Sequence, residues 1–142
     1  MSATIWFRPH TLEQLRATLV NMPQHLGIEF TELVPDFLSG RMPVNERTRQ
    51  PYGILHGGAS VALAETLGST AASLVVDPDT YRVVGQEINA NHVRAVSDGF
   101  VVGTTRAFHI GRRSHVWEIR IEDERQRLVC ISRLTMAVME KS

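Results

Sequence analysis

The segment Leu55–Val76, with the sequence LHGGASVALAETLGSTAASLVV, constrains the fold of this chain more than any other. After His56, Gly57 and Gly58 its residues are apolar or small on every side, which is typical of a helix buried in a core. The exception is Glu65, and a carboxylate is seldom buried without a partner or a chemical task. The segment therefore predicts a long central helix, from Gly57 to about Val76, that carries one functional carboxylate.

The residues after this helix alternate with a period of 2, which predicts strands. Asp77-Pro78-Asp79 ends the helix, because the residue before a proline is driven out of the helical conformation. Extended segments follow over 81–94, 100–109, 115–122 and 128–139, and Asp98-Gly99 predicts a hairpin turn between the first two. In the third segment the alternation places four side chains inward: His115, Trp117, Ile119 and Ile121.

The residues before the central helix predict a short helix and two strands. Thr11 and Gln14 have the spacing of a capping box, and leucines at helical spacing continue that helix to about Met22. Residues 28–34 and 37–44 read as strands on either side of Pro35-Asp36. We therefore predict one α+β domain over 1–142, in which an antiparallel sheet curls around one long helix.

The composition narrows the kinds of partner and cofactor. Among 142 residues there are 15 Lys and Arg and 15 Asp and Glu, so charge gives no reason to expect nucleic acid or an anionic membrane as partner. Cys130 is the only cysteine, and no set of His, Asp, Glu and Cys has metal-ligand spacing, so neither a disulfide nor a metal site is predicted. No segment reads as a secretory signal or has membrane-spanning length. We therefore expect a cytoplasmic protein.

The start of the central helix is the first candidate site. Its first N–H groups have no partner inside the helix and lie at the positive end of the helix dipole. Glycine lets a substrate oxygen come close, so the Gly57 N–H can act as an oxyanion donor. Glu65, two turns further on, can then act as nucleophile or base toward the same carbonyl. Ser69 shares the face of Glu65; the alternative is a core serine whose hydroxyl bonds back to the Glu65 carbonyl.

Further candidates lie outside this helix, each with a structural alternative. Gln50 precedes His56 by six residues and can orient a water or a carboxylate, or it is a solvated loop residue. His92 ends an amide-rich segment and is either an active-site group or a structural strand histidine, and Arg94 follows it. Gly111-Arg112-Arg113-Ser114 is a basic turn able to hold a phosphate, unless it is a solvated hairpin tip.

Four segments of the chain carry motifs of a known family: RTRQPYGILHGGAS at 47–60, AETLGS at 64–69, VGQEINANH at 84–92 and HIG at 109–111. They resemble the hotdog-fold thioesterases of the phenylacetate and aryl-CoA group, and the resemblance covers nearly the whole chain. It is greatest to the bacterial thioesterases of menaquinone synthesis, which act on dihydroxynaphthoyl-CoA, and to those of enterobactin synthesis.

The resemblance implies a hotdog fold in which the sheets of two subunits join, two such dimers form a tetramer, and each active site lies at the dimer interface. It implies Glu65 as the catalytic carboxylate and Gly57 as the oxyanion donor. The residues that it implies for positioning the thioester and the water are Gln50, His56, Ser69 and His92. The residues that it implies for the CoA arm and nucleotide are Arg94, Gly111, Arg112, Arg113 and Ser114. It implies no cofactor beyond the CoA of the substrate.

Three functions are compatible with these residues. The first is hydrolysis of an acyl-CoA, in particular an aryl-CoA, or of an acyl-carrier thioester. A hotdog hydroxyacyl dehydratase would pair His92 with Glu65 but would leave Gln50 and Ser69 without a role. A non-catalytic acyl-CoA-binding protein would not need Glu65 in an apolar helix. The residues favour the thioesterase and leave the acyl group open.

Overall fold

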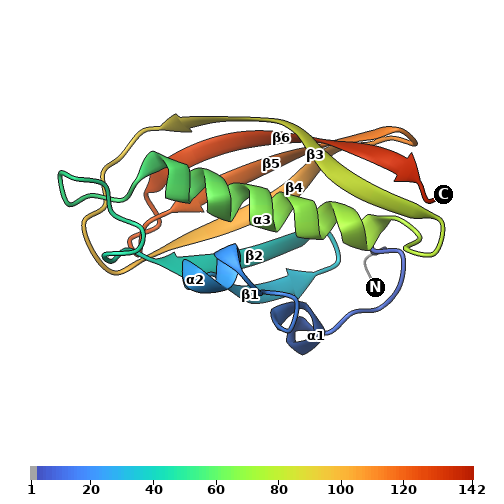
Figure 1. Ribbon diagram of the computed structural model, residues 1–142, viewed down its shortest axis with the longest axis horizontal. Coiled ribbons are helices and arrows are strands. Elements are labelled where there is room, and N and C mark those ends of the chain that lie inside the picture. The colour runs from blue at the N-terminus through green and yellow to red at the C-terminus, as the bar shows by residue number, and fades with distance from the viewer. Residues whose placement is uncertain (1–2) are drawn as a thin grey trace.

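The computed structural model describes residues 3–142, in which a curved six-stranded antiparallel sheet wraps around the long helix α3, Gly57–Val75 (Figure 1). The strands are β1 (Glu29–Val34), β2 (Phe37–Pro43), β3 (Tyr81–His92), β4 (Phe100–Ile110), β5 (Ser114–Glu122) and β6 (Leu128–Glu140). Their order in the sheet is β1-β2-β4-β5-β6-β3. The predicted α+β class, with a sheet curled around one central helix, is confirmed.

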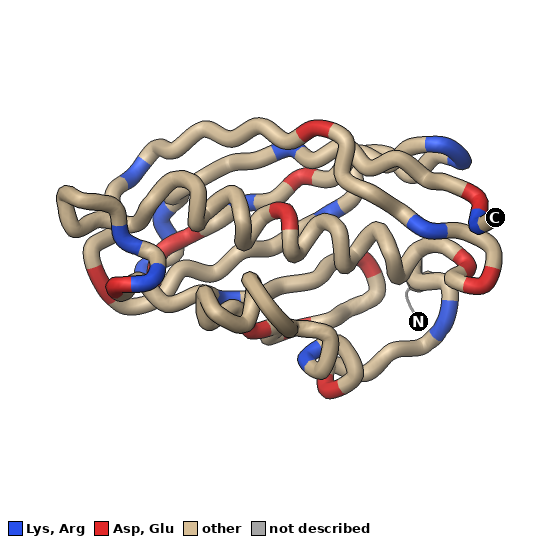
Figure 2. Tube along the Cα trace, viewed as in Figure 1, with Lys and Arg blue, Asp and Glu red and all other residues tan. Residues whose placement is uncertain are grey.

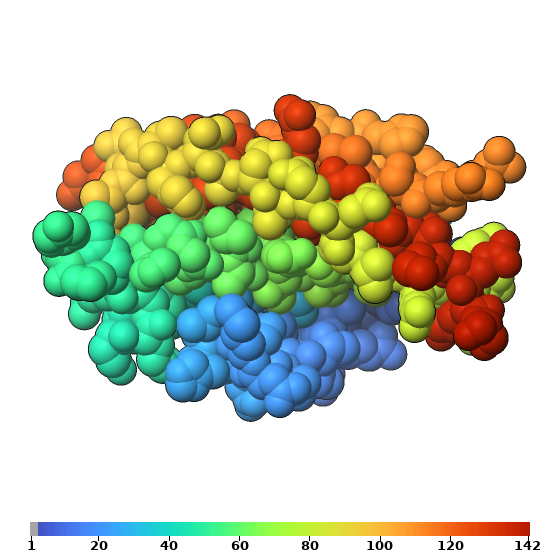
Figure 3. Space-filling model, turned by 45° about the horizontal axis from the view of Figure 1, so that its top comes forward, coloured from blue at the N-terminus to red at the C-terminus, as the bar shows by residue number. Residues whose placement is uncertain are grey.

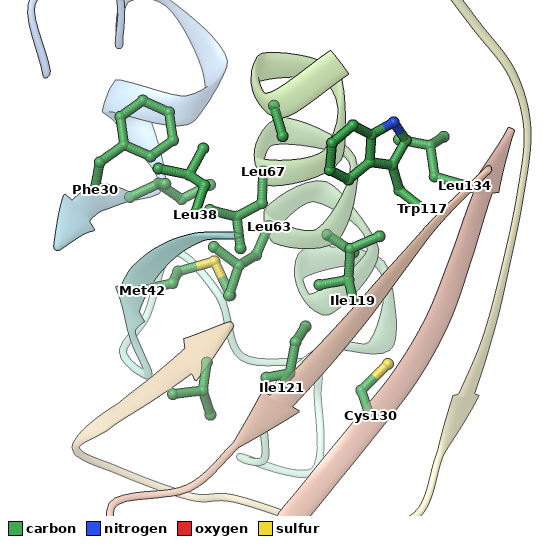
Figure 4. Close-up of a cluster of buried hydrophobic side chains, with 14 of the residues drawn as sticks. Phe30, Leu38, Met42, Leu63, Leu67, Trp117, Ile119, Ile121, Cys130 and Leu134 are labelled. Carbon is green, nitrogen blue, oxygen red and sulfur yellow. The ribbon is translucent and has the colours of Figure 1, made fainter. Parts of the chain in front are cut away.

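The hydrophobic core lies between α3 and the facing side of the sheet (Figure 4). Leu67 of α3 fits against two strand glycines, Gly40 and Gly103, which are partners in the β2–β4 ladder. A Cβ on Gly103 would lie 2.7 Å from Cδ1 of Leu67, so the absent side chain lets the sheet approach the helix closely. The inward placement predicted for the third segment is confirmed, because four residues of β5 are at most 1% exposed: His115, Trp117, Ile119 and Ile121.

One face of α3 is not covered by the sheet. Figure 3 shows it at the surface between β3 and the N-terminal part of the chain. The prediction of a helix buried on every side is therefore wrong for a single chain. The half-buried residues on this face include Val61, Ala62, Glu65, Thr66, Ser69 and Thr70.

The N-terminal helix has the predicted start and a different end. Thr11 Oγ1 accepts the Gln14 N–H at 3.1 Å, and Gln14 Oε1 accepts the Thr11 N–H at 2.9 Å, so the capping box of α1 (Leu12–Arg16) is confirmed. The helix ends at Arg16 instead of near Met22. Asn21 has a φ of 61° and turns the chain, and a separate helix, α2 (Met22–His25), begins with Pro23 in its first turn.

The chain between β3 and β4 is a crossing and not a hairpin. β3 pairs with β6 at the edge of the sheet, whereas β4 lies between β2 and β5. Residues 93–99 therefore cross from the edge to the middle of the sheet, and the hairpin predicted at Asp98-Gly99 is wrong. Gly99, with a φ of 75°, turns the chain into β4, and its carbonyl accepts the Val44 N–H at 2.8 Å.

Candidate functional site

The start of α3 leaves one backbone donor free. His56 is the N-cap residue, and its Nδ1 accepts the Gly58 N–H at 2.7 Å. The His56 N–H donates to the Thr48 carbonyl at 2.7 Å. Within residues 3–142 no acceptor is found for the Gly57 N–H between them. An N–H at the positive end of a helix, with no acceptor of its own, suits a developing negative charge on oxygen.

His92, the last residue of β3, lies over Gly57. A Cβ on Gly57 would be 2.8 Å from Nε2 of His92 and 3.2 Å from Cδ2 and Cε1, so the imidazole occupies the space that a side chain would fill. A depression of about 390 Å³ opens here, and four of the predicted site residues line it: Gln50, Gly57, His92 and Arg94. The sequence-based prediction that these residues share one place is consistent with this arrangement.

Gln50 is held by its own loop. Its N–H donates to the Ile54 carbonyl at 2.8 Å, and its Oε1 accepts the Tyr52 N–H. Because the side-chain oxygen is engaged, the amide NH₂ is the end of Gln50 that is free to donate. The loop therefore presents a hydrogen-bond donor to the depression.

Glu65 and Ser69 lie further along α3, where the helix passes β3 and β6. Oε2 of Glu65 occupies the place of the missing side chain of Gly85 in β3. No hydrogen bond or ion pair to the Glu65 carboxylate is found in the described part of the chain. Glu65 is the only charged residue of α3, and Figure 2 shows this helix as otherwise uncharged. The carboxylate is thus free to act on a substrate or on a water.

The Ser69 hydroxyl does not bond back to the helix. Thr66 Oγ1 donates to the Ala62 carbonyl at 2.7 Å, and Ser73 Oγ donates to the Thr70 carbonyl at 2.6 Å. The contact of Ser69 Oγ is instead with Sδ of Met136 at 3.8 Å, a weak acceptor. The back-bonded alternative for Ser69 is therefore wrong, and its hydroxyl remains available beside Glu65.

The basic turn at 111–114 is far from Gly57, His92 and Arg94 of the same chain. Arg112 and Arg113 line a separate depression of about 400 Å³ together with Tyr81. Tyr81 and His92 are the two ends of β3, which are about 36 Å apart at 3.3 Å per residue. Gly111 and Ser114 close the turn through a Gly111 N–H to Ser114 carbonyl bond of 2.9 Å. Within one chain, the turn residues predicted to bind the nucleotide lie near one end of β3, and Arg94 lies just beyond the other end.

Sequence reasoning missed the residues that surround Glu65 and Ser69. Gly85 and Met136 are partners in the β3–β6 ladder, beside a bulge between Gly85 and Glu87. The signal that could have revealed this contact is Gly85 itself, because a glycine inside a strand often marks a place where another group approaches the backbone closely. The alternation in β5 predicts that His115 points inward, but it does not predict which residues surround it. In the structure His115 pairs with Met136 in the β5–β6 ladder.

Burial shifts two titratable groups behind the site. It lowers the pKa of His115, with a smaller contribution from the charge of His109, so burial favours the neutral form of this imidazole. It raises the pKa of the Cys130 thiol, which removes the thiolate character that a nucleophilic cysteine requires. Neither group faces the depression at Gln50 and His92.

Two kinds of feature are absent from residues 3–142. No group of three or more His, Cys, Asp and Glu side chains in that range is placed to hold a metal ion. No helix in that range is long and apolar enough to cross a membrane.

Comparisons with known proteins identify the family. The model of the thioesterase superfamily matches residues 52–130, more than half of the chain. The chain belongs to the thioesterase superfamily. A similar relative is the proofreading thioesterase EntH of Cronobacter turicensis, 56% identical over 136 residues, which are 95% of this chain and 98% of the relative. Another is the 1,4-dihydroxy-2-naphthoyl-CoA hydrolase of Escherichia coli K12, 50% identical over 136 residues, 95% of this chain and 99% of the relative.

A solved structure supports the same assignment. It is a mutant thioesterase from Pseudomonas aeruginosa, with a TM-score of 0.95 and 46% identity, and the match covers 97% of this chain and 100% of that chain. The resemblance to hotdog thioesterases is therefore confirmed. This thioesterase is a thioester hydrolase, and the dehydratase and non-catalytic alternatives are set aside.

Proposed function

We propose that this thioesterase hydrolyses acyl-CoA thioesters with an aromatic acyl group, using Glu65 as nucleophile or general base and the Gly57 N–H as oxyanion donor. The observation that carries the proposal is that both groups lie on α3 without a partner in residues 3–142. The N–H would stabilise the negative charge on the thioester oxygen, while the carboxylate, or a water it deprotonates, attacks the carbon. The naphthoyl-CoA named for one relative supports an aromatic acyl group.

These two groups do not reach one carbonyl within a single chain. Gly57 and Glu65 are eight residues apart, about 12 Å along the helix axis at 1.5 Å per residue. The Gly57 N–H also points out of the helix start, away from Glu65. Reacting atoms need to be about 3–3.5 Å apart. The expectation that both groups of one helix face one carbonyl therefore needs a correction: the second group has to come from another subunit.

A second copy paired along β3 would supply it. β3 is an edge strand of 12 residues, and an unpaired strand edge is a template for another chain. In each chain, Gly57 of α3 contacts His92 of β3, and Glu65 of α3 contacts Gly85 of β3. A two-fold axis beside Val61 of α3, and between residues 88 and 89 of β3, exchanges these two ends. It brings the Gly57 N–H of one chain to the Glu65 carboxylate of its partner. We expect two such dimers to associate into a tetramer.

The same axis would bring the basic turn at 111–114 close to Arg94, although the two are far apart within one chain. It sets Tyr81 opposite residue 96 of the partner, so the neighbouring Arg112 and Arg113 approach the partner's Arg94. The cationic side chains that are separated within one chain would then line one path to the reacting carbonyl. Guanidinium groups suit the phosphates of CoA, because they bind phosphate oxygens in pairs. This supports CoA as the thiol, and it is a property of the dimer.

The proposal is tested by replacing the carboxylate. Glu65→Ala should lower the hydrolysis of benzoyl-CoA by about 10²–10⁴-fold, the range for loss of a general base, and leave KM within a few-fold. Release of free CoA thiol measures the rate. The matched control is Glu118→Ala, which removes a carboxylate from the outer face of β5 and should turn over at the wild-type rate. Near-native turnover by Glu65→Ala would overturn the proposed mechanism.

A further inference from the structure

Gly85 has no conformational reason to be glycine. The glycines with positive φ in the described chain are Gly27, Gly53 and Gly99, so the backbone of Gly85 is in a region open to any residue. Glycine also weakens a strand, because it has no side chain to pack and loses more freedom on folding. Its presence in the middle of β3 therefore has to be explained by the space that a side chain would take.

That space is occupied by the Glu65 carboxylate. A Cβ on Gly85 would overlap Oε2 of Glu65, and the next atoms around it are Cδ of Glu65 at 3.6 Å and Sδ of Met136 at 4.0 Å. The other strand glycines that face α3 behave differently. Leu67 takes up space at both Gly40 and Gly103, and the Glu29 carbonyl oxygen also crowds Gly40, so those positions serve the packing of the sheet against the apolar core. Gly85 is matched to a charged side chain on the open face of the helix.

The β-bulge adds to this contact. The ladder between β3 and β6 shifts register from Gly85 to Glu87, which leaves Gln86 as an extra residue. A bulge bends its strand locally and is often found where a strand redirects a functional side chain. The bend and the missing side chain occur together, at the place where β3 meets Glu65.

We propose that Gly85 is a positioning residue for the Glu65 carboxylate. The bare Cα of Gly85 and the bulge beside it form a seat that fixes where the carboxylate lies. Any side chain at position 85 moves the carboxylate out of line with the thioester carbonyl. This inference rests on the proposed role of Glu65 in thioester hydrolysis.

The experiment compares two glycine-to-alanine variants. In Gly85→Ala the methyl meets only the far end of a flexible side chain, so the variant should fold with an unchanged or higher Tm. Its kcat for benzoyl-CoA should fall by about 10²-fold, the cost of misplacing a reacting group by about 1 Å, with KM within about threefold. The control is Gly103→Ala, whose Cβ would crowd Leu67 and Leu63. It should lower Tm and leave kcat of the folded enzyme within about threefold.

A second background separates positioning from a general effect of the methyl group. Glu65→Asp shortens the side chain by one methylene, so its carboxylate no longer reaches Gly85. Adding Gly85→Ala to Glu65→Asp should then change kcat by less than about threefold. Because both variants are slow, the release of free thiol is followed over hours. The inference is overturned if Gly85→Ala alone keeps kcat within threefold of wild type. It is also overturned if Gly85→Ala costs the same factor in both backgrounds. Loss of activity in Glu65→Ala beside a normal Gly85→Ala would reject this inference alone and leave the proposed function standing.

Discussion

Unmatched polar groups mark the site at the scale of single residues. Some polar groups along α3 are satisfied locally, as the Gly58 N–H and the Thr66 hydroxyl are. The Gly57 N–H, the Glu65 carboxylate and the Ser69 hydroxyl lack a strong partner in residues 3–142. All three residues are half-buried, so water or a substrate can reach these groups. Leaving such a group without any partner costs free energy, and the three are therefore expected to meet substrate or water.

His115 gives a prediction of a different kind, because it is buried with Nδ1 unpaired in the described chain. Its pKa in the folded protein lies below the ordinary 6.5. The unfolded chain therefore takes up a proton more readily, and the free energy of unfolding should decrease as pH falls below about 6.5, levelling off below the folded pKa. His115→Leu should remove this contribution, so the Tm of wild type should drop relative to the variant between pH 7 and pH 5.

Thermal unfolding at several pH values from 5 to 8 measures the difference. His109→Gln is the control, because burial and not His109 is the larger cause of the shift, and most of the pH dependence should survive in it. Equal changes of Tm with pH in wild type and His115→Leu would show that another group titrates.

At the scale of elements, periodicity predicted most of what local sequence determines. Period 2 in β5 and the apolar residues of α3 reflect contacts with one core, and both elements were predicted within one or two residues. Asp98-Gly99 failed because a turn signal does not say which strands pair, and β3 pairs with β6, which is distant in sequence. The contact of Glu65 with Gly85 was missed for the same reason. It depends on how a helix and a strand cross.

The N-cap of α3 has a stability role that can be measured apart from activity. His56 Nδ1 accepts the Gly58 N–H. His56→Ala removes this acceptor and should lower the free energy of unfolding by about 1 kcal/mol. His56→Asn keeps a capping oxygen and should lower the free energy of unfolding by only about a few tenths of a kcal/mol. Urea unfolding at neutral pH compares the two. If both variants lose the same stability, capping is not what His56 contributes to the fold.

At the scale of the whole molecule, the predicted site is divided between two places. The residues at Gln50, Gly57 and His92 lie at one end of β3, and the basic turn lies at the other end. The resemblance had assigned all of them to one site at a dimer interface. Periodicity and spacing could not have made that assignment, because they describe one chain and contain no information on a second copy.

Mixed dimers test this division directly. A Glu65→Ala chain keeps Arg94, which lies at the Gly57 end, and an Arg94→Ala chain keeps the carboxylate. Alone, the first should be inactive, and the second should have a KM raised at least about tenfold by loss of charged hydrogen bonds. If each site takes its carboxylate from one chain and its Arg94 from the other, every mixed dimer regains one intact site. Co-expression with two affinity tags isolates the mixed dimers.

The expected result is a return of the wild-type KM, with kcat per dimer at roughly half of the wild-type value, since one of two symmetry-related sites is restored. The control pairs Glu65→Ala with Ser69→Ala. These two side chains belong to the same half of a site, so their mixed dimers contain no intact site and should gain no activity. Restoration in the first mixture and not in the second requires a site shared between subunits. If the first mixture kept the high KM, the carboxylate and Arg94 would not meet across the dimer, and the two-fold arrangement along β3 would be wrong.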